Sequence, residues 1–210
     1  MREKKGILIV VSGFSGAGKG TLMKKLMQDY DNYALSISAT TRQPRVGEED
    51  GREYFFRTKE EFEKMIARDE LIEYARYVEN YYGTPKQYVM EQLEAGKDVI
   101  LEIEIQGARK IKKKFPEAVL VFVTAPSMGE LKERLVGRGT ETAEVIHQRL
   151  ARAAQEAEGV DEYDYLLVND QLEDAVDRLH NIIQSEHFAM RRNLGFIHEI
   201  QAQAAKFVEE

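Results

Sequence analysis

Gly13-Phe14-Ser15-Gly16-Ala17-Gly18-Lys19-Gly20-Thr21 is the stretch that decides the fold of this 210-residue chain. The apolar run Ile7–Val11 before it predicts a buried strand, and the segment Leu22–Tyr30 after it predicts a helix. Between a strand and a helix, the spacing Gly-x4-Gly-Lys predicts a phosphate-binding loop, because glycines let backbone N–H groups converge on a polyphosphate at the helix N-terminus. We expect Lys19 to bridge the β- and γ-phosphates. A glycine-rich turn that binds no ligand is the alternative.

One position departs from the usual loop. The motif normally places Ser or Thr directly after its lysine, where the hydroxyl binds Mg²⁺. This chain has Gly20 there, followed by Thr21. Whether Thr21 supplies the hydroxyl ligand is therefore open from the sequence.

Further apolar runs predict strands that are buried on both faces, as a parallel sheet requires. These runs are Val99–Ile105, Val119–Val123 and Tyr165–Val168. Helix starts alternate with them, at the capping boxes Thr58–Glu61 and Thr84–Gln87 and at Ser127–Glu130, and Gly96 is a helix stop. Strands that alternate with helices predict an α/β fold with a parallel sheet flanked by helices.

Two segments fit this alternation badly and are predicted to be inserts. Residues 35–83 are polar and rich in Arg, Glu and Tyr, and residues 126–159 are helical and charged, with a joint at Gly137 and Gly139. The core is then formed by residues 1–34, 84–125 and 160–190. Residues 191–210 are predicted to form an appended helix near a break at Gly195. Three roles remain open for that extension: to cap the core, to form a dimer, or to stay partly disordered.

Composition restricts the class of function. The formal net charge of −7 disfavours non-specific binding to nucleic acid or to an acidic membrane. The chain has no cysteine, which excludes disulfides and thiolate metal sites. No apolar run approaches the length of a membrane span, and the run near the N-terminus is too short for a signal peptide. We expect a cytoplasmic protein without nucleic-acid or membrane partners, either monomeric or homo-oligomeric.

A pair of carboxylates follows one of the buried runs. In Leu101–Gly107, alternation along a strand would place Glu102 and Glu104 on one face, roughly 7 Å apart. Ligands bind at the carboxyl ends of parallel strands in α/β folds. The two acids could hold Mg²⁺ through water or accept hydrogen bonds from a base. An edge strand with one solvated face explains the same pattern.

Arginines in the first insert form a candidate phosphate site. Within Ser36–Glu48, Arg42 and Arg45 lie on either side of a proline-stiffened turn, and Tyr54 follows a short loop later. Arginine forks with a phenol suit a phosphate monoester. A solvated charged loop explains the stretch equally well.

Arginines in the second insert form another candidate. Arg134 and Arg138 are four residues apart, so they share a helix face, and Arg149 follows further along. Taken alone, a surface ion-pair ladder with Glu130 and Glu133 is the simpler interpretation.

The block Ser-x-Ser-x-Thr-Thr-Arg-x-Pro-Arg-x-Gly-Glu, with its downstream Tyr54, resembles the guanylate kinase family. The likeness runs from the first strand to about Leu172, and generic phosphate-loop proteins lack this block. The resemblance implies that residues 35–83 bind GMP and that residues 126–159 form a helical lid over ATP. Family members often carry Asp where this chain has Glu102 and Glu104, so each carboxylate here reaches one methylene further.

The resemblance also implies roles for single residues. For the GMP phosphate it implies Arg42, Arg45, Tyr54 and Tyr82; for the guanine, Ser38, Glu73, Thr84 and Glu104; for the ATP phosphates, Arg134, Arg138 and Arg149, besides the loop from Gly13 to Thr21; and near the adenine, Asn169. Glu73 could accept both the N1–H and N2–H donors of guanine, a pair that adenine lacks. Thr21 and Glu102 are the candidates for Mg²⁺, with water as a possible intermediary.

The expected reaction is MgATP + GMP giving MgADP + GDP by direct in-line transfer, with dGMP as a second acceptor. The attacking phosphate oxygen is already anionic, so no general base is needed, and catalysis rests on Lys19, Arg42 and the lid arginines together with Mg²⁺. Three alternatives stay open. They are a non-catalytic interaction module of the same fold, a kinase for another small phosphorylated acceptor such as a sugar, and a nucleotide-hydrolysing switch protein.

Overall fold

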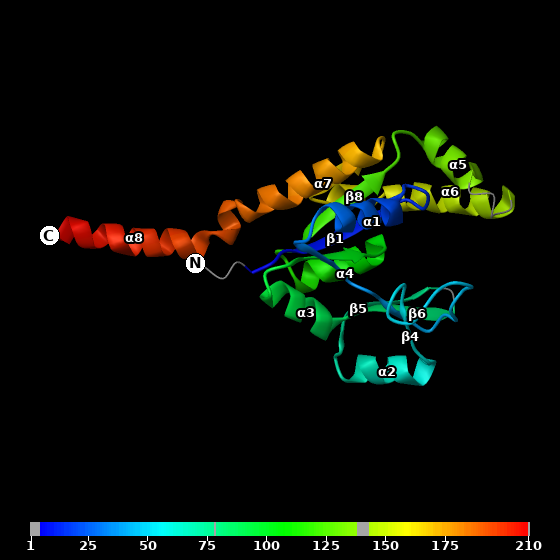
Figure 1. Cartoon of the computed structure of the whole chain (residues 1–210), viewed down its shortest axis with the longest axis horizontal. Coiled ribbons are helices and arrows are strands. Elements are labelled where there is room, and N and C mark those ends of the chain that lie inside the picture. Colours follow the sequence, from blue (N-terminus) through cyan, green and yellow to red (C-terminus); the bar gives the residue numbers. More distant parts are fainter. Residues whose placement is uncertain (1–4, 78, 138–142, 210) are drawn as a thin grey trace.

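A five-stranded parallel sheet and a smaller four-stranded sheet organise the computed structural model, which describes residues 5–77, 79–137 and 143–209 (Figure 1). The larger sheet has the strand order β2-β7-β1-β8-β9. Its strands are β1 (Leu8–Gly13), β2 (Tyr33–Leu35), β7 (Asp98–Glu102), β8 (Val119–Thr124) and β9 (Tyr165–Val168). Ile9 of β1 lies between Ile100 of β7 and Val119 of β8, so the strand that enters the glycine loop is central. The predicted parallel α/β fold is confirmed.

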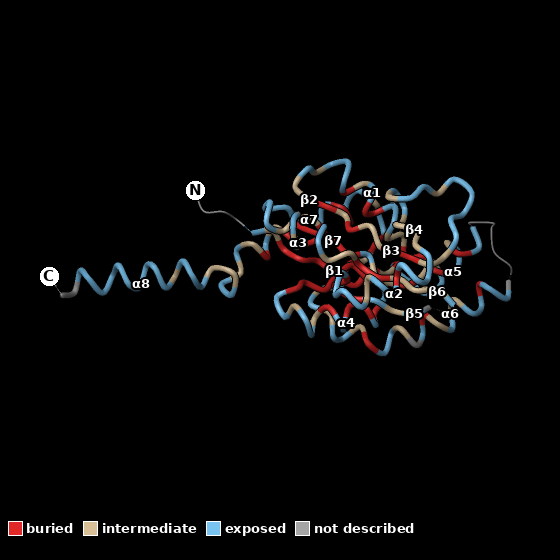
Figure 2. The backbone as a smooth tube through the Cα atoms, turned by 90° about the horizontal axis from the view of Figure 1, so that it is seen from below, coloured by how far each residue is buried: buried red, intermediate tan, exposed pale blue. Residues whose placement is uncertain are grey.

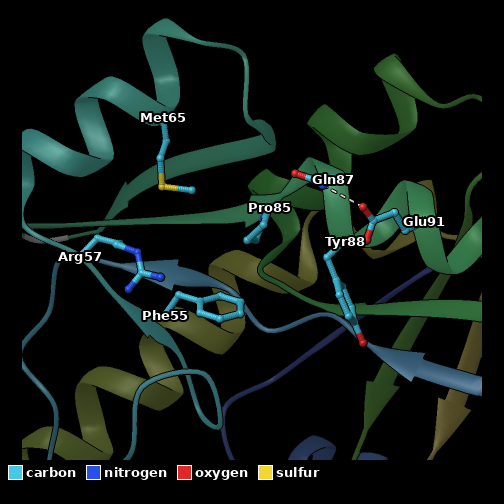
Figure 3. A pocket seen from close by; sticks show the side chains of 7 residues that line it. All are labelled: Phe55, Arg57, Met65, Pro85, Gln87, Tyr88 and Glu91. Carbon is cyan, nitrogen blue, oxygen red and sulfur yellow. Dashed lines mark hydrogen bonds between the residues drawn. The ribbon is translucent and has the colours of Figure 1, made fainter.

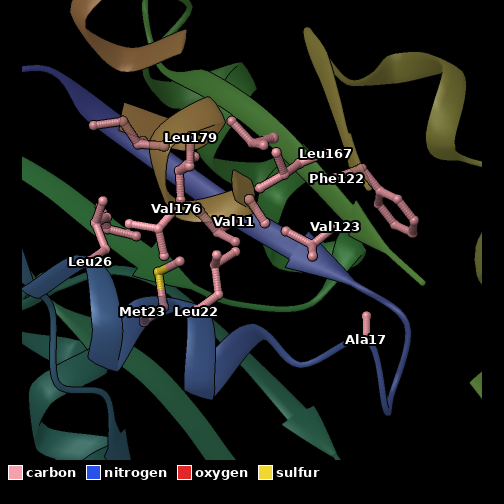
Figure 4. Packing of buried hydrophobic residues seen from close by; sticks show 14 of the residues in the cluster. Val11, Ala17, Leu22, Met23, Leu26, Phe122, Val123, Leu167, Val176 and Leu179 are labelled. Atoms are coloured by element: carbon pink, nitrogen blue, oxygen red, sulfur yellow. The ribbon is translucent and has the colours of Figure 1, made fainter. Parts of the chain in front are cut away.

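Helices cover both faces of this sheet, because its strands are apolar on both sides. They are α1 (Lys19–Asp29), α3 (Lys86–Glu94), α4 (Ile105–Lys114) and α7 (Leu172–His187). Val11 of β1 packs with Leu22 of α1 and Val176 of α7 in the cluster of Figure 4. Its neighbour Val10 points to the other face, where it belongs to a cluster that includes Ile111 of α4. Alternate residues of β1 therefore anchor opposite layers.

The smaller sheet has the order β4-β3-β6-β5 and lies beside α2. Its elements are β3 (Ala39–Thr40), β4 (Phe55–Phe56), α2 (Lys59–Ala67), β5 (Leu71–Tyr77) and β6 (Asn80–Pro85). Ala39, Phe62 and Leu71 form a core of their own. Ile72 of β5 instead packs in the α3/α4 layer of the main sheet, which ties the small sheet to the large one. The capping box that begins at Thr58 is present and confirms the predicted start of α2.

Two helices follow β8 and lie near the glycine loop. They are α5 (Met128–Gly137) and α6 (Ala143–Ala157), and the short 3₁₀ helix Val160–Glu162 leads from them to β9. The Ser127 hydroxyl accepts a 3.1 Å hydrogen bond from the Glu130 N–H, which confirms the predicted helix start. Arg138 and the predicted joint at Gly139 lie outside the described residues.

The predicted strand Val99–Ile105 is too long by three residues. β7 ends at Glu102, and Glu104 is the residue that precedes the first turn of α4. Glu102 and Glu104 therefore do not share a strand face, and the expected spacing along a strand does not apply. The chain leaves the sheet at this point because Ile105, Ala108 and Ile111 bury one stripe of a helix.

The predicted capping box at Thr84–Gln87 is wrong. Thr84 and Pro85 are the last residues of β6, and α3 begins at Lys86 without a side-chain cap. The Thr84 hydroxyl instead donates a 3.0 Å hydrogen bond to Oε1 of Glu73 on the neighbouring strand. The local sequence predicted that the Thr84 hydroxyl caps α3, but its hydrogen-bond partner is Glu73, eleven residues earlier in the chain.

The C-terminal part extends the molecule at one end. After α7, the 3₁₀ turn Met190–Arg192 leads into α8 (Leu194–Glu209), which projects away from the body in Figures 1 and 2. The chain turns before this helix at Met190–Arg192, and Gly195, the predicted break, is within the first turn of α8. Among the described residues, no helix is long and apolar enough to cross a membrane.

Candidate active site

The glycine loop joins the end of β1 to the start of α1, as its sequence predicts. A Cβ on Gly13 would lie 2.0 Å from the carbonyl oxygen of Val123, and Gly18 has a positive φ of 87°. Only glycine fits both positions. The first turn of α1 has no side-chain cap, so its N–H groups are available to an anion.

Lys19 folds its side chain back over the loop. Its Nζ donates to the carbonyl oxygens of Gly13, at 2.7 Å, and Phe14, at 3.2 Å. The ammonium group is therefore fixed at the mouth of the loop, where a polyphosphate would lie. Gly20 and Thr21 follow it on the exposed side of α1.

The helix α6 brings one arginine to this loop, and α5 brings another to Asn169, which contacts the loop. Arg134 donates a 2.8 Å hydrogen bond to the backbone oxygen of Asn169 and is paired with Glu130. Arg149 donates to the hydroxyl of Ser15. Residues that lie about 130 positions apart in the sequence thus surround one loop.

Asn169 supports the loop from β9. Its side-chain N–H donates a 2.8 Å hydrogen bond to the carbonyl oxygen of Ala17, and the residue is buried. A Cβ on Gly18 would approach that amide nitrogen to 2.5 Å, so this glycine also makes room for Asn169.

Arg42, Tyr54 and Tyr82, which were predicted to bind a phosphate, lie close together on the small sheet. The guanidinium of Arg42 lies 5.3 Å from the ring centre of Tyr54, and the Tyr54 and Tyr82 ring centres are 6.1 Å apart. Arg42 also forms a 3.0 Å ion pair with Glu48, a partner that the sequence interpretation did not include among the site residues. Arg45 is exposed, and its backbone N–H donates to Glu48 at 2.7 Å.

The predicted guanine-reading acid is buried. Glu73 is 8% exposed, Thr84 is fully buried, and the hydrogen bond between them is the only one that the described residues give the Glu73 carboxylate. Desolvation raises the pKa of Glu73, against the opposing effect of the Thr84 hydrogen bond. A Cβ on Gly107 would lie 3.2 Å from Oε2, so α4 closes over this carboxylate at a glycine. Ser38, half-buried, directly precedes β3.

Glu102, the last residue of β7, acts electrostatically on both the glycine loop and Tyr54 of the small sheet. Its side chain is open to solvent, yet the surrounding protein desolvates the carboxylate enough to raise its pKa, which the charge of Lys19 opposes. Burial likewise raises the pKa of Tyr54, and the Glu102 charge adds to that effect. Glu102 is thus close enough to act electrostatically on both the loop lysine and the phenol of the small sheet.

Glu104 faces the helices that follow β8. Its carboxylate accepts a 2.8 Å hydrogen bond from Arg152 of α6, which also pairs with Glu156. Sequence reasoning missed Arg152. A signal was available, because Arg152 lies three residues after Arg149 and shares its helix face.

A fixed all-protein metal centre is absent from the described part of the chain, where no cluster of three or more acidic or histidine side chains could hold an ion. Thr21 and Glu102 offer a hydroxyl and a carboxylate on the loop side. That oxygen donor set fits Mg²⁺, which keeps several waters and needs few protein ligands.

A separate pocket lies on the small sheet (Figure 3). It is lined by Phe55, Arg57, Met65, Pro85, Gln87, Tyr88 and Glu91. None of these residues belongs to the loop or to the predicted acceptor set; the side chains come from β4, α2, β6, α3 and the segment between β4 and α2. The candidate active site is therefore assigned from the hydrogen bonds and charged side chains around the glycine loop and Glu73, and this pocket is not part of it.

A glycine loop between a parallel strand and a helix, with a lysine fixed at its mouth and arginines brought to it from later helices, defines a P-loop nucleotide-binding protein. The family model described as guanylate kinase matches residues 5–186. The chain belongs to the guanylate kinase family.

Individual relatives agree with that family over nearly the whole chain. The guanylate kinase of Halalkalibacterium halodurans is 51% identical over 200 residues, which cover 95% of this chain and 98% of the relative. That of Oceanobacillus iheyensis is 53% identical over 192 residues, with 91% and 93% covered. The crystal structure of guanylate kinase from Anaplasma phagocytophilum superposes with a TM-score of 0.76 at 32% identity, covering 95% of this chain and 96% of that one.

Proposed function

We propose that the chain transfers the γ-phosphoryl group of ATP to GMP, and to dGMP, giving ADP and the nucleoside diphosphate. The observation that carries this proposal is the buried pair of Glu73 and Thr84, placed on the small sheet beside Arg42 and Tyr54. A carboxylate without a cationic partner in its hydrogen-bond contacts suits the two adjacent N–H donors of guanine.

The donor half of the proposed site is the glycine loop. Backbone N–H groups between Gly13 and Thr21 hold the polyphosphate, and Lys19 bridges its β- and γ-groups. Arg134 and Arg149, joined by Arg138, neutralise the charge that spreads over the transferred group. Asn169 contributes to ATP binding beside the adenine and through its hydrogen bond to the loop.

The acceptor half is the small sheet with its neighbours. Arg42, Arg45, Tyr54 and Tyr82 hold the GMP phosphate, and Ser38, Glu73, Thr84 and Glu104 read the base. Arg42 is held by Glu48, so a phosphate would compete with that carboxylate for the same guanidinium. Glu104 is paired with Arg152 of α6, so base reading and the position of the lid helices are linked in this proposal.

The chemistry needs positioning more than acid–base catalysis. The attacking phosphate oxygen is already ionised, so no residue must remove a proton. Lys19 and the arginines orient the two phosphates in line and balance their charge, and closure of α5 and α6 excludes the water that would otherwise accept the phosphoryl group. Thr21 and Glu102 would hold Mg²⁺, directly or through water, and the ion would supply further positive charge to the ATP phosphates. The proposal includes a cytoplasmic location and no nucleic-acid or membrane partner.

One acceptor panel tests the proposal. ADP formation is followed with ATP and each of GMP, dGMP, AMP, UMP and CMP. We expect activity with the guanine nucleotides alone. Equal rates with AMP would refute the base-reading set, and binding of GMP without turnover would favour the non-catalytic module. ADP formation without any acceptor would favour a hydrolysing switch protein.

A further inference from the structure

The C-terminal helix α8 carries an exposed apolar stripe. Phe196, Ile200 and Phe207 are 43%, 45% and 79% exposed, and their spacings of four and seven residues place them on one face of the helix. Ile197 and Ala204 border the same face. Soluble monomers rarely expose a contiguous apolar patch of this kind.

The stripe lies far from the rest of the fold. α8 projects beyond the body in two views at right angles (Figures 1 and 2), and it lies after residue 186, where the match to the guanylate kinase family model ends. Phe188 and Met190, at the base of the projection, are 79% and 62% exposed. Apolar side chains are thus exposed at the base of α8 as well as along the helix.

We propose that a second copy of this chain covers the stripe, with the two α8 helices packed antiparallel about a twofold axis. This arrangement lets one surface patch meet itself, as the interface of a symmetric dimer requires. If the helices cross at their midpoints, Ile200 of each copy lies opposite Ala204 of the other, and Ile197 lies opposite Phe207. At the centre, the large Ile200 then faces the small Ala204, which favours close packing, and the two apolar side chains Ile197 and Phe207 meet further out.

The charges beside the stripe select the antiparallel direction. Glu199 and Lys206 are seven residues apart, so they lie on the same flank of the stripe, one on each side of the helix midpoint. Antiparallel packing brings Glu199 of each copy next to Lys206 of the other. Parallel packing would set Glu199 against Glu199 and Lys206 against Lys206, and would also align the two helix dipoles.

The proposed dimer leaves both active sites accessible. The helices α5 and α6 and the small sheet lie at the end of the molecule opposite α8 in Figure 1. A helix of 16 residues is about 24 Å long, so the contact belongs to the lower end of the size range of specific interfaces. The dimer should therefore dissociate on dilution while activity per chain stays constant.

Sedimentation of the full chain over a range of concentrations tests the proposal. We expect a reversible monomer–dimer equilibrium in the wild type, and a rise of more than about tenfold in the dissociation constant for Ile200→Glu. Ala202→Glu is the matched control, since it puts the same charge on the opposite face of the same helix and should leave the equilibrium unchanged. Kinase activity and circular dichroism confirm that each variant is folded.

A charge exchange tests the direction of packing. Glu199→Lys and Lys206→Glu should each weaken the dimer, and the double variant should restore it, because antiparallel packing pairs these two positions. Single variants without effect would exclude the antiparallel arrangement. A wild type that stays monomeric at all concentrations, or a dimer that Ile200→Glu leaves intact, would overturn the proposal, as would capture of the monomer by lipid vesicles through α8.

Discussion

Thr84 donates a 3.0 Å hydrogen bond to the carboxylate of Glu73, and both side chains are buried between the small sheet and α4. The two residues lie on adjacent antiparallel strands, eleven positions apart in the sequence. Burying a carboxylate with one neutral donor is costly unless a ligand supplies more donors. This buried pair is therefore the observation that most specifically supports the proposed guanine site.

Replacing Glu73 by Gln should remove the preference for guanine. The amide presents one acceptor and one donor where guanine needs two acceptors, and each lost hydrogen bond to a charged group is worth about 1.5–3 kcal/mol. We expect kcat/KM with GMP to fall about 10²–10⁴-fold while ATP binding is retained, measured in a coupled assay. Glu70→Gln, at an exposed acid in the same region, is the control. A Glu73→Gln enzyme that still distinguishes GMP from AMP would contradict the assignment.

Replacing Lys19 by Ala should abolish most of the turnover and leave acceptor binding intact. Lys19 is fixed over the loop by the carbonyl oxygens of Gly13 and Phe14, and the Glu73 pair lies on the separate small sheet. Loss of one preorganised charge at the transferred group costs about 10²–10³-fold in kcat or more. Steady-state kinetics together with GMP titration measure the two effects. Lys24→Ala, on the exposed side of α1, should behave as wild type, and unchanged turnover in Lys19→Ala would defeat the mechanism.

The buried Glu73 should lower stability as the pH rises. Burial raises its pKa, so the native state retains the proton longer than the unfolded chain does. Native-state stability from this group is then greatest at low pH and declines from the ordinary carboxyl pKa up to the raised one. We expect Glu73→Gln to gain free energy of unfolding relative to wild type as the pH rises above about 4, the ordinary carboxyl pKa, measured by urea denaturation without ligand.

The pKa of Glu186 is shifted in the opposite direction from that of Glu73, so its effect on stability should depend on pH in the opposite way. Burial opposes its ionisation, but hydrogen bonds from Tyr165, Arg191 and Arg192 outweigh that effect and hold its pKa below the ordinary value. Its contribution to stability is present above the ordinary carboxyl pKa and is lost as the pH falls through the lowered one. Glu186→Gln should therefore lose free energy of unfolding relative to wild type at neutral pH and less at acid pH. The same slope for both variants would mean that burial alone does not set these pKa values.

Breaking the contact between Arg152 and Glu104 should affect GMP more than stability. The pair joins α6 to the start of α4, and both side chains are partly exposed, so its contribution to stability is within about 1 kcal/mol. Arg152→Ala should raise KM for GMP several-fold and change KM for ATP less, in the same coupled assay. Glu156→Gln removes a different carboxylate partner of Arg152 and spares the bridge to Glu104. Equal effects of the two variants would argue against the bridge.

The fold was predictable because its determinants are local. Ile7–Val11, the glycine loop and the alternating apolar runs predict the parallel sheet and its helices, and the structure adds that the strand before the loop is central. The errors came from positions where tertiary contacts decide. Thr84 was predicted to cap a helix, but its hydroxyl bonds to Glu73 on the neighbouring strand. Glu104 was predicted to lie in a strand, but it precedes a helix that begins at Ile105 and packs its apolar stripe inward.

The sequence predicted which residues belong to the candidate site, but it did not predict which of them contact one another. The structure brings Lys19 and Arg149 to the glycine loop, Arg134 to Asn169 beside that loop, and Arg42 to Tyr54, which packs against Tyr82. Pairings such as Arg42 with Glu48 and Glu104 with Arg152 depend on how separate elements meet, which no single stretch of sequence encodes. The role of Arg138 stays a prediction, since it lies outside the described residues.

The most direct test of the central claim is the fate of the γ-phosphoryl group of labelled ATP. With GMP present, the account predicts that the label appears in GDP at the same rate as ADP forms, and that replacing GMP by AMP stops both. Label released as inorganic phosphate in place of GDP, or transferred equally well to AMP, would contradict it.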